Sequence, residues 1–100
     1  SKHYAPSTST IFSEDIEKTL ATITEKRVGV VSFCKKYSHP AIHYQKKLSS
    51  NGSLEEAASR LYATLHEMDA QPIDVIIVEK VPNEGIGVAI NDKLLRASAV

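Results

Sequence analysis

The sequence predicts an α/β fold in which a mostly parallel sheet of about four strands has helices on both faces. Short apolar runs alternate along the chain with segments whose apolar residues recur every three or four positions, the order expected for such a sheet. Two runs, 28–33 and 75–78, are apolar at odd and even positions alike, as in strands covered on both faces. The length of 100 residues suffices for one core.

The first elements follow from local signals. Residues 8–12 are predicted to form a strand. Residues 14–25 have apolar positions at spacings of four and three, which predicts a helix with Ser13 as its N-cap. Lys26 and Arg27 suit the negative end of that helix.

The middle of the chain supplies two further strands and the sharpest local motif. Residues 28–33 form a buried strand, and residues 41–48 alternate weakly and carry lysines, as edge strands often do. Ser53 and Glu56 match a capping box, which predicts a helix that begins after Ser53 and runs to about Asp69.

The last third continues the alternation. Residues 75–78, flanked by Ile73, are the most strand-like run. Residues 81–87 are predicted to form a loop, and 88–99 return to helical spacing. The predicted domain is therefore a three-layer, Rossmann-like α/β unit over residues 8–100.

Composition excludes several classes of protein. Twelve basic and twelve acidic residues give a formal net charge of zero, which argues against a dedicated nucleic-acid binder. The single cysteine, Cys34, excludes an internal disulfide framework and a cysteine-rich zinc site. It suits a reducing compartment, so a cytoplasmic location is expected. No apolar run approaches the length of a membrane span, so no membrane partner is expected.

Two stretches have residues suited to ligand binding, and each also has a structural explanation. Gly85 and Gly87 lie between a strand and a helix, where glycines let backbone N–H groups approach an anion or simply form a tight turn. The segment 35–47 contains four lysines and no acid, which suits a tRNA or phosphate ligand but also a solvated edge strand. The histidines and Cys34 form no recognisable metal-ligand or nucleophile–base set, so no metal site is expected.

Two motifs together resemble one family. Residues 55–58 read EEAA, residues 65–69 read LHEMD, and residues 82–97 read PNEGIGVAINDKLLRA. This succession resembles the C-terminal domain of the long, two-domain form of threonylcarbamoyl-AMP synthase. Residues 2–6, KHYAP, resemble the H-Y-x-P motif of the linker that joins this domain to a YrdC-type catalytic domain. Tyr62 stands where the family usually has phenylalanine, and His66 where it usually has arginine.

The resemblance implies a role in a larger enzyme. The family condenses L-threonine, bicarbonate and ATP to threonylcarbamoyl-AMP and pyrophosphate, for threonylcarbamoyladenosine modification of tRNA. The active site lies in the other domain, so the resemblance implies that this chain alone is inactive and binds no cofactor, while ATP and Mg belong to the full-length enzyme. Residues 1–7 would be a stub of the linker.

The resemblance also suggests particular site residues. In the linker, His3, Tyr4 and Pro6 are expected to lie over the nucleotide as part of a lid, although Tyr4 has an alternative role as an anchor on its own domain. Five residues of the last loop and helix are expected to face the linker or the catalytic domain: Asn83, Gly85, Gly87, Asn91 and Arg96. Arg96 has the alternative of satisfying helix-end carbonyls.

Two other functions remain open on the sequence. One is a module that docks tRNA or a partner protein of tRNA modification through residues 35–47, without a direct role in catalysis. The other is a stand-alone nucleotide-binding domain that uses Gly85 and Gly87.

Overall fold

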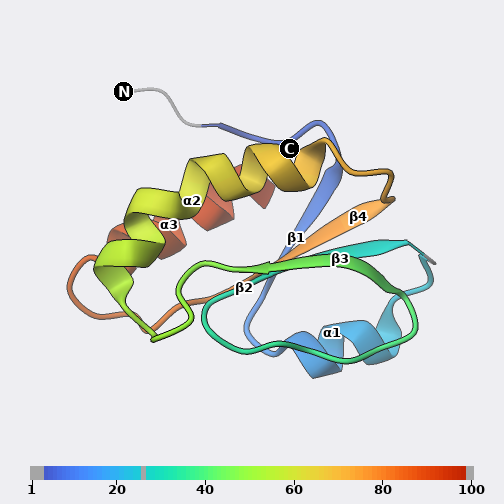
Figure 1. The fold of residues 1–100 in the computed structure, drawn as a ribbon, viewed down its shortest axis with the longest axis horizontal. Coiled ribbons are helices and arrows are strands. Elements are labelled where there is room, and N and C mark those ends of the chain that lie inside the picture. Colours follow the sequence, from blue (N-terminus) through green and yellow to red (C-terminus); the bar gives the residue numbers. More distant parts are fainter. Residues whose placement is uncertain (1–3, 26, 99–100) are drawn as a thin grey trace.

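The computed structural model describes residues 4–25 and 27–98. It shows a four-stranded sheet in the order β1-β4-β2-β3, with every neighbouring pair parallel. The strands are β1 (Ser9–Ser13), β2 (Val28–Ser32), β3 (Ile42–Lys47) and β4 (Val75–Glu79), and the helices are α1 (Ile16–Thr22), α2 (Leu54–Asp69) and α3 (Gly87–Ser98). Helix α1 covers one face of the sheet, and α2 and α3 cover the other (Figure 1). The predicted three-layer α/β fold is confirmed.

The path of the chain decides which segments lie together. From β1 the chain passes through α1 to β2 and on to β3, and from β3 it returns through α2 to β4. The crossovers β1–α1–β2 and β3–α2–β4 run across the sheet in opposite directions. Two such crossovers of the same handedness place their helices on opposite faces of the sheet. Because the strands are parallel, the segments that follow them meet at the carboxyl end of the sheet. The arm before β1 lies at the amino end, beside the last turn of α2 (Figure 1).

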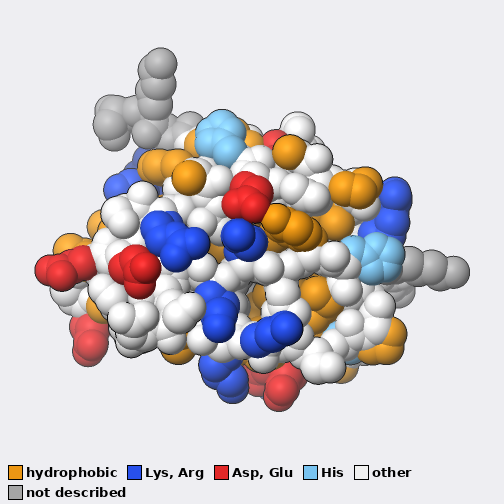
Figure 2. Space-filling model, viewed as in Figure 1, with side chains coloured by type: hydrophobic (Ala, Val, Ile, Leu, Met, Phe, Trp, Pro, Cys, Tyr) orange, Lys and Arg blue, Asp and Glu red, His pale blue; other side chains and the backbone are white. Residues whose placement is uncertain are grey.

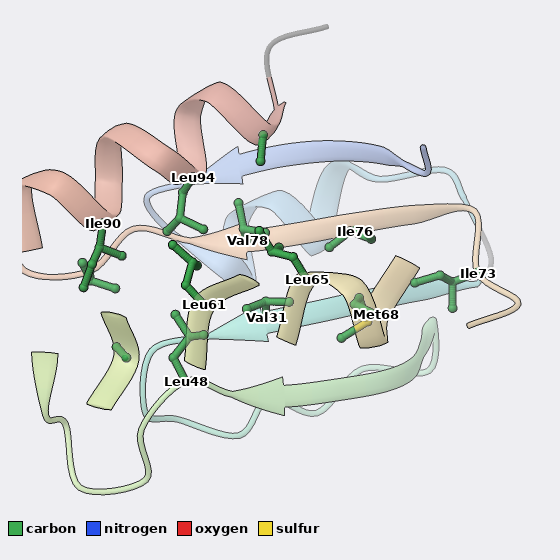
Figure 3. Packing of buried hydrophobic residues seen from close by; sticks show 13 residues of the cluster. Val31, Leu48, Leu61, Leu65, Met68, Ile73, Ile76, Val78, Ile90 and Leu94 are labelled. Atoms are coloured by element: carbon green, nitrogen blue, oxygen red, sulfur yellow. The ribbon is translucent and has the colours of Figure 1, made fainter. Parts of the chain in front are cut away.

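Two hydrophobic clusters hold the layers together. In the larger one, Leu61 and Leu65 of α2 pack with Val31 of β2 and Val78 of β4 (Figure 3). The smaller cluster joins α1 to the opposite face of β2 and β4. Strands β2 and β4 are thus buried on both faces, as their unbroken apolar runs predict.

Helix α1 is shorter than predicted and has a different cap. Asp15, not Ser13, is the N-cap, and its carboxylate accepts from the backbone N–H of Lys18 at 3.2 Å. Ser13 is the last residue of β1, and its hydroxyl lies 2.7 Å from that of Thr19. At the other end the helix stops at Thr22, because Ile23 is extended and its partly buried side chain packs on the smaller cluster.

The positive residues after α1 do not cap it. Arg27 instead forms an ion pair with Asp74, with 2.9 Å between Nη2 and Oδ1, and Lys26 lies outside the described residues. The pair joins the segments that lead into β2 and β4, which enter the sheet side by side.

Helix α2 has the predicted N-cap, but the second hydrogen bond of the predicted capping box is replaced. The Ser53 side chain accepts from the N–H of Glu56, as a capping box requires. The Glu56 carboxylate, however, accepts from the hydroxyl of Ser49, which in turn accepts from the N–H of Ser53. A third side chain therefore completes the box and joins the end of β3 to the start of α2.

Strand β3 is the predicted edge strand and runs parallel to β2. It follows β2 through residues 33–41, a loop whose Tyr37 packs in the smaller cluster on the α1 face. In the part of the chain that the structure describes, no helix is long and apolar enough to cross a membrane.

Candidate functional site

The N-terminal arm, residues 4–8, is held by one carboxylate. Five groups of the arm donate hydrogen bonds to Asp69: the Tyr4 hydroxyl at 2.7 Å, the Ser7 N–H at 3.0 Å and hydroxyl at 3.3 Å, and the Thr8 N–H at 2.9 Å and hydroxyl at 2.7 Å. We call this arrangement the Asp69 clasp. A carboxylate has about four lone-pair positions, so Asp69 is fully engaged by the arm.

Ring contacts and burial reinforce the clasp. The Tyr4 ring stacks on the ring of His66, with centroids 3.8 Å apart and an angle of 27° between the planes. Pro6 is buried, while Tyr4 keeps part of its surface exposed. His66 lies one turn before Asp69 on α2, so both contacts of Tyr4 come from the last turn of one helix.

The clasp shifts the titration of both partners. Partial burial works to raise the pKa of Asp69, but hydrogen bonds from Thr8, Tyr4 and Ser7 outweigh it and hold that pKa well below its usual range. Burial, the hydrogen bond to Asp69 and the charge of Asp69 raise the pKa of Tyr4 to about 12. At neutral pH the clasp is therefore an ionised carboxylate with a neutral phenol.

The position of Asp69 on α2 is itself informative. The carboxylate ends a helix whose C-terminus already carries negative partial charge, a place where an acidic side chain is electrostatically unfavourable. The donors of the arm offset this cost. The helix by itself therefore gives no reason for an acid at this position, whereas the arm does.

The second predicted group of residues lies elsewhere. The loop 80–86 follows β4 at the carboxyl end of the sheet, so the structure does not bring Asn83, Gly85 or Gly87 together with Tyr4. His3 lies outside the described residues.

This loop is fastened by its own domain. The buried side chain of Asn91 accepts from the Val81 N–H at 2.9 Å and donates to the Val81 carbonyl at 2.9 Å, and it also donates to the Asn83 side chain at 3.3 Å. A Cβ on Gly87 would lie 1.9 Å from the Pro82 carbonyl oxygen, so α3 begins at the one residue that fits there.

The other two residues of this group have smaller roles. Gly85 adopts a φ of +55°, the left-handed conformation that glycine tolerates. Arg96 pairs with Asp92 one turn away at 3.1 Å, with both side chains exposed, rather than satisfying helix-end carbonyls. The geometry at the two glycines is that of a tight turn with close packing. That this loop also contacts the linker or another domain stays a prediction.

A third polar cluster lies at the carboxyl ends of β4 and β2. The Glu79 carboxylate accepts from the Phe33 N–H at 2.8 Å and from the Tyr37 hydroxyl at 2.6 Å. Burial, that hydrogen bond and the nearby acids Glu79, Glu17 and Asp15 raise the pKa of Tyr37. All these partners are internal, so the cluster fastens the loop 33–41 to the sheet. Among the described residues, no group of three or more His, Cys, Asp or Glu is placed to hold a metal ion.

The chain matches a known protein family over nearly its whole length. The family model described as "Threonylcarbamoyl-AMP synthase, C-terminal domain" matches residues 1–99. The chain belongs to this family. The predicted resemblance is thereby confirmed for the chain as a whole.

Curated relatives place this C-terminal domain within longer proteins. The threonylcarbamoyl-AMP synthase of Bacillus subtilis is 29% identical over 102 residues, and that of Pyrococcus abyssi is 33% identical over 107 residues. These matches cover 96% and 97% of this chain but 30% of each relative. The chain thus spans about a third of the length of the curated relatives it matches.

Solved structures of a relative share the fold. The crystal structure of P. abyssi Sua5 complexed with L-threonine has a TM-score of 0.74 at 32% identity, covering 98% of this chain and 30% of that one. A second structure is of a P. abyssi Sua5 variant in which a histidine and the tyrosine after it are both replaced by alanine. Its TM-score is 0.73 at 29% identity, covering 93% of this chain and 28% of that one.

Two members of the site in this C-terminal domain escaped sequence reasoning. The sequence predicts Asp69 only as the end of a helix, and His66 only as one of the histidines that form no metal-ligand set. Both fall in the segment 65–69 that carries part of the family resemblance. Asp69 and His66 could have been identified if the sequence indicated that this segment contacts the H-Y-x-P segment. No pattern within either segment indicates that contact.

Proposed function

We propose that this chain is the accessory domain of a two-domain threonylcarbamoyl-AMP synthase and that it directs the linker across the nucleotide pocket of the catalytic domain. The whole enzyme would condense L-threonine, bicarbonate and ATP to threonylcarbamoyl-AMP and pyrophosphate, in the cytoplasmic pathway of tRNA modification. Residues 1–7 would belong to the linker and 8–100 to the accessory domain. The membership of the family and the threefold greater length of the relatives support this assignment.

The Asp69 clasp is the observation on which the role of the domain rests. A linker that only joined two domains would need no fixed path, yet five donors of this arm converge on one carboxylate. A fixed arm leaves the domain in one direction and so positions whatever precedes it. Ordering the arm in advance also reduces the entropy that closing a lid would otherwise cost.

Tyr4 can serve the lid through its ring rather than its hydroxyl. The hydroxyl is committed to Asp69, and one face of the ring lies on His66, but part of the side chain remains exposed. An aromatic surface of this kind suits stacking against a nucleotide base. The P. abyssi variant has a His–Tyr pair replaced, and this chain has one such pair at residues 3–4 and another at residues 43–44.

A lid has a chemical purpose in this reaction. Threonylcarbamoyl-AMP is a mixed anhydride, which water hydrolyses, and a covered pocket excludes water until the product leaves. We assign ATP and Mg to the catalytic domain, for which the greater length of the relatives leaves room. We therefore expect the isolated chain to be inactive. Product formed above the blank by residues 1–100 with ATP, L-threonine and bicarbonate would contradict this.

Three variants of the full-length protein test the lid. Tyr4→Ala removes the ring and the clasp hydroxyl, Tyr4→Phe removes the hydroxyl alone, and Asp69→Ala removes the acceptor. We expect Tyr4→Ala and Asp69→Ala to lower product formation by about tenfold to a hundredfold, since misplacing a positioning group costs that much. Tyr4→Phe should fall between these variants and the wild type. Product is measured by chromatography and ATP affinity by titration.

Asp74→Ala is the matched control, since Asp74 is an exposed carboxylate that pairs with Arg27 and does not contact the arm. Unchanged product yield and ATP affinity in Tyr4→Ala would reject the lid. An equal loss in Asp69→Ala and Asp74→Ala would show a general loss of stability rather than a role for the clasp.

A further inference from the structure

A second surface, whose lining does not include His66 or Asp69 of the clasp, carries a concentration of positive charge. Lys and Arg side chains gather over β3 and the neighbouring part of α2 (Figure 2). They surround a hollow of about 370 Å³ lined by Lys36, Gln45, Lys46, Lys47, Ser50 and Arg60. We call this the β3 groove. The chain as a whole has no net charge, so the charge here results from segregation: residues 35–52 contain no acid.

The cations lie on both sides of an edge strand. Lys46 shares a face of β3 with Tyr44 and reaches Glu67 of α2 at 3.5 Å. Gln45 lies on the opposite face, where its side chain pairs with the backbone of Tyr37, and Lys47 has the same parity. The groove therefore wraps around the outer edge of the sheet.

Two of the four cations have no partner within the described part of the chain. Lys46 pairs with Glu67 and Arg60 with Glu56, both at 3.5 Å and both partly exposed. Lys36 and Lys47 form no ion pair with any described residue. Clustered lysines repel one another, so leaving two uncompensated beside two others is unfavourable unless a negative ligand neutralises them.

The form of the groove favours an extended ligand. All four cations are at least partly exposed, so their charged ends remain solvated. They are spread from the loop 33–41 across β3 to α2. Strand β3 pairs with β2 alone in the sheet described, so its outward N–H groups add further donors.

We propose that the β3 groove binds the phosphodiester backbone of an RNA strand. Several spaced, solvated cations gain affinity by releasing counterions, an effect that is large for a polynucleotide backbone and small for a single small anion. Ser50 lines the same hollow, and its hydroxyl can donate to phosphate or sugar oxygens. The lining among the described residues is mostly cationic, which suits contacts to the backbone rather than to base edges, so we expect binding to be insensitive to sequence.

The test is titration of the chain into a short fluorescein-labelled RNA at increasing KCl, followed by anisotropy. Four contacts predict that the logarithm of the binding constant falls with the logarithm of salt with a slope of roughly 3. Lys36→Gln/Lys47→Gln should reduce that slope by about 1.4 and weaken binding by about tenfold at low salt. The control Lys80→Gln/Lys93→Gln removes the same charge from exposed sites after β4 and on α3, and should bind like the wild type. Circular dichroism verifies that both variants fold.

Competition identifies the ligand class. We expect unlabelled RNA to displace the label at phosphate concentrations at which pyrophosphate, ATP and polyglutamate do not. Absence of binding at low salt, or equal weakening by both double variants, would overturn the proposal. Displacement by pyrophosphate or ATP as efficient as by RNA would overturn it in favour of a site for small phosphates, and displacement by polyglutamate in favour of a surface for an acidic protein. The result does not depend on the clasp, because Asp69 lies at the amino end of the sheet, outside the groove.

Discussion

The arm at the amino end of the sheet and the glycine loop at its carboxyl end both fall in family motifs, yet they are held in opposite ways. The loop is fixed by buried atoms: the Asn91 amide pairs with both polar groups of Val81, and Gly87 leaves no space beside Pro82. The arm is fixed mainly by polar bonds to one half-buried carboxylate, Asp69. The loop cannot be released without disrupting the fold, whereas the arm can.

The contrast shows that residues from different motifs of the same family resemblance can have two kinds of role. Residues whose contacts are buried and internal, such as Asn91, serve the fold. Residues that gather polar bonds from another segment at the surface, such as Asp69, serve the position of that segment. Substitutions in the loop should therefore cost more stability than substitutions in the arm.

Gly87→Ala should cause the greatest loss of stability. Its Cβ would collide with the Pro82 carbonyl, which belongs to the backbone and cannot swing away. We expect a loss of about 3 kcal/mol in the free energy of urea unfolding. Gly85→Ala is the matched control: its φ of +55° is strained for alanine, but nothing lies within 4 Å of the new Cβ, so about 1 kcal/mol is expected. Equal losses would show that the close approach at Gly87 is unimportant.

Asn91→Ala should cost about 2 kcal/mol, because the buried N–H and carbonyl of Val81 lose their partners. Asn83→Ala removes only the 3.3 Å bond to Asn91 at an exposed site and should cost under about 0.5 kcal/mol. Thermal unfolding of the two variants gives the comparison. A smaller effect at Asn91 than at Asn83 would refute the view that this amide fastens the loop.

Two tyrosines test whether a hydroxyl matters only where it has a partner. Tyr4→Phe loses a bond to Asp69 and should destabilise by about 1 kcal/mol. The Tyr62 hydroxyl is buried and has no partner among the described residues, so Tyr62→Phe should be neutral or stabilising. Denaturant titration of both variants measures the two changes in stability. A larger loss of stability in Tyr62→Phe than in Tyr4→Phe would contradict the view that only the Tyr4 hydroxyl has a partner.

Acid should release the arm later than an ordinary aspartate would predict. The pKa of Asp69 is depressed in the folded protein, so the clasp contributes its full stabilisation above the ordinary aspartate pKa of about 4. Its contribution is lost only as the pH falls through the lower, folded value. The amide chemical shifts of Ser7 and Thr8 should therefore stay constant down to about pH 4 and move below it. A transition at or above about pH 4 would show that the carboxylate is not stabilised by the arm.

Arg96→Ala should have little effect. Its pair with Asp92 is exposed on both sides, so a loss within about 0.5 kcal/mol is expected. A loss of several kcal/mol in the thermal unfolding of the isolated chain would mean that Arg96 has a structural role in the fold that the ion pair does not reveal.

Much of the fold is predictable from the sequence because it rests on local patterns. The apolar runs of β2 and β4 and the Ser53 cap of α2 each act within a few residues. The errors arise where distant packing overrides local preference. Ile23 leaves α1 to fill the smaller cluster, and Ser49 replaces half of a capping box.

The site was less predictable for the same reason. Tyr4 and Asp69 are 65 residues apart and meet only because α2 runs back to the amino end of the sheet, beside the arm. No periodicity within either segment records that encounter. The family resemblance pointed to Tyr4, but the partner that fixes its position required the three-dimensional arrangement.

Amide hydrogen exchange at Ser7 and Thr8 probes the clasp itself, because both N–H groups donate to Asp69 and to nothing else among the described residues. We predict that both amides are protected in the wild type and in Asp74→Ala, and that Asp69→Ala exposes them to exchange while residues of β4 keep their protection. Unchanged protection of Ser7 and Thr8 in Asp69→Ala would refute the clasp, since the arm would then be held by something other than this carboxylate.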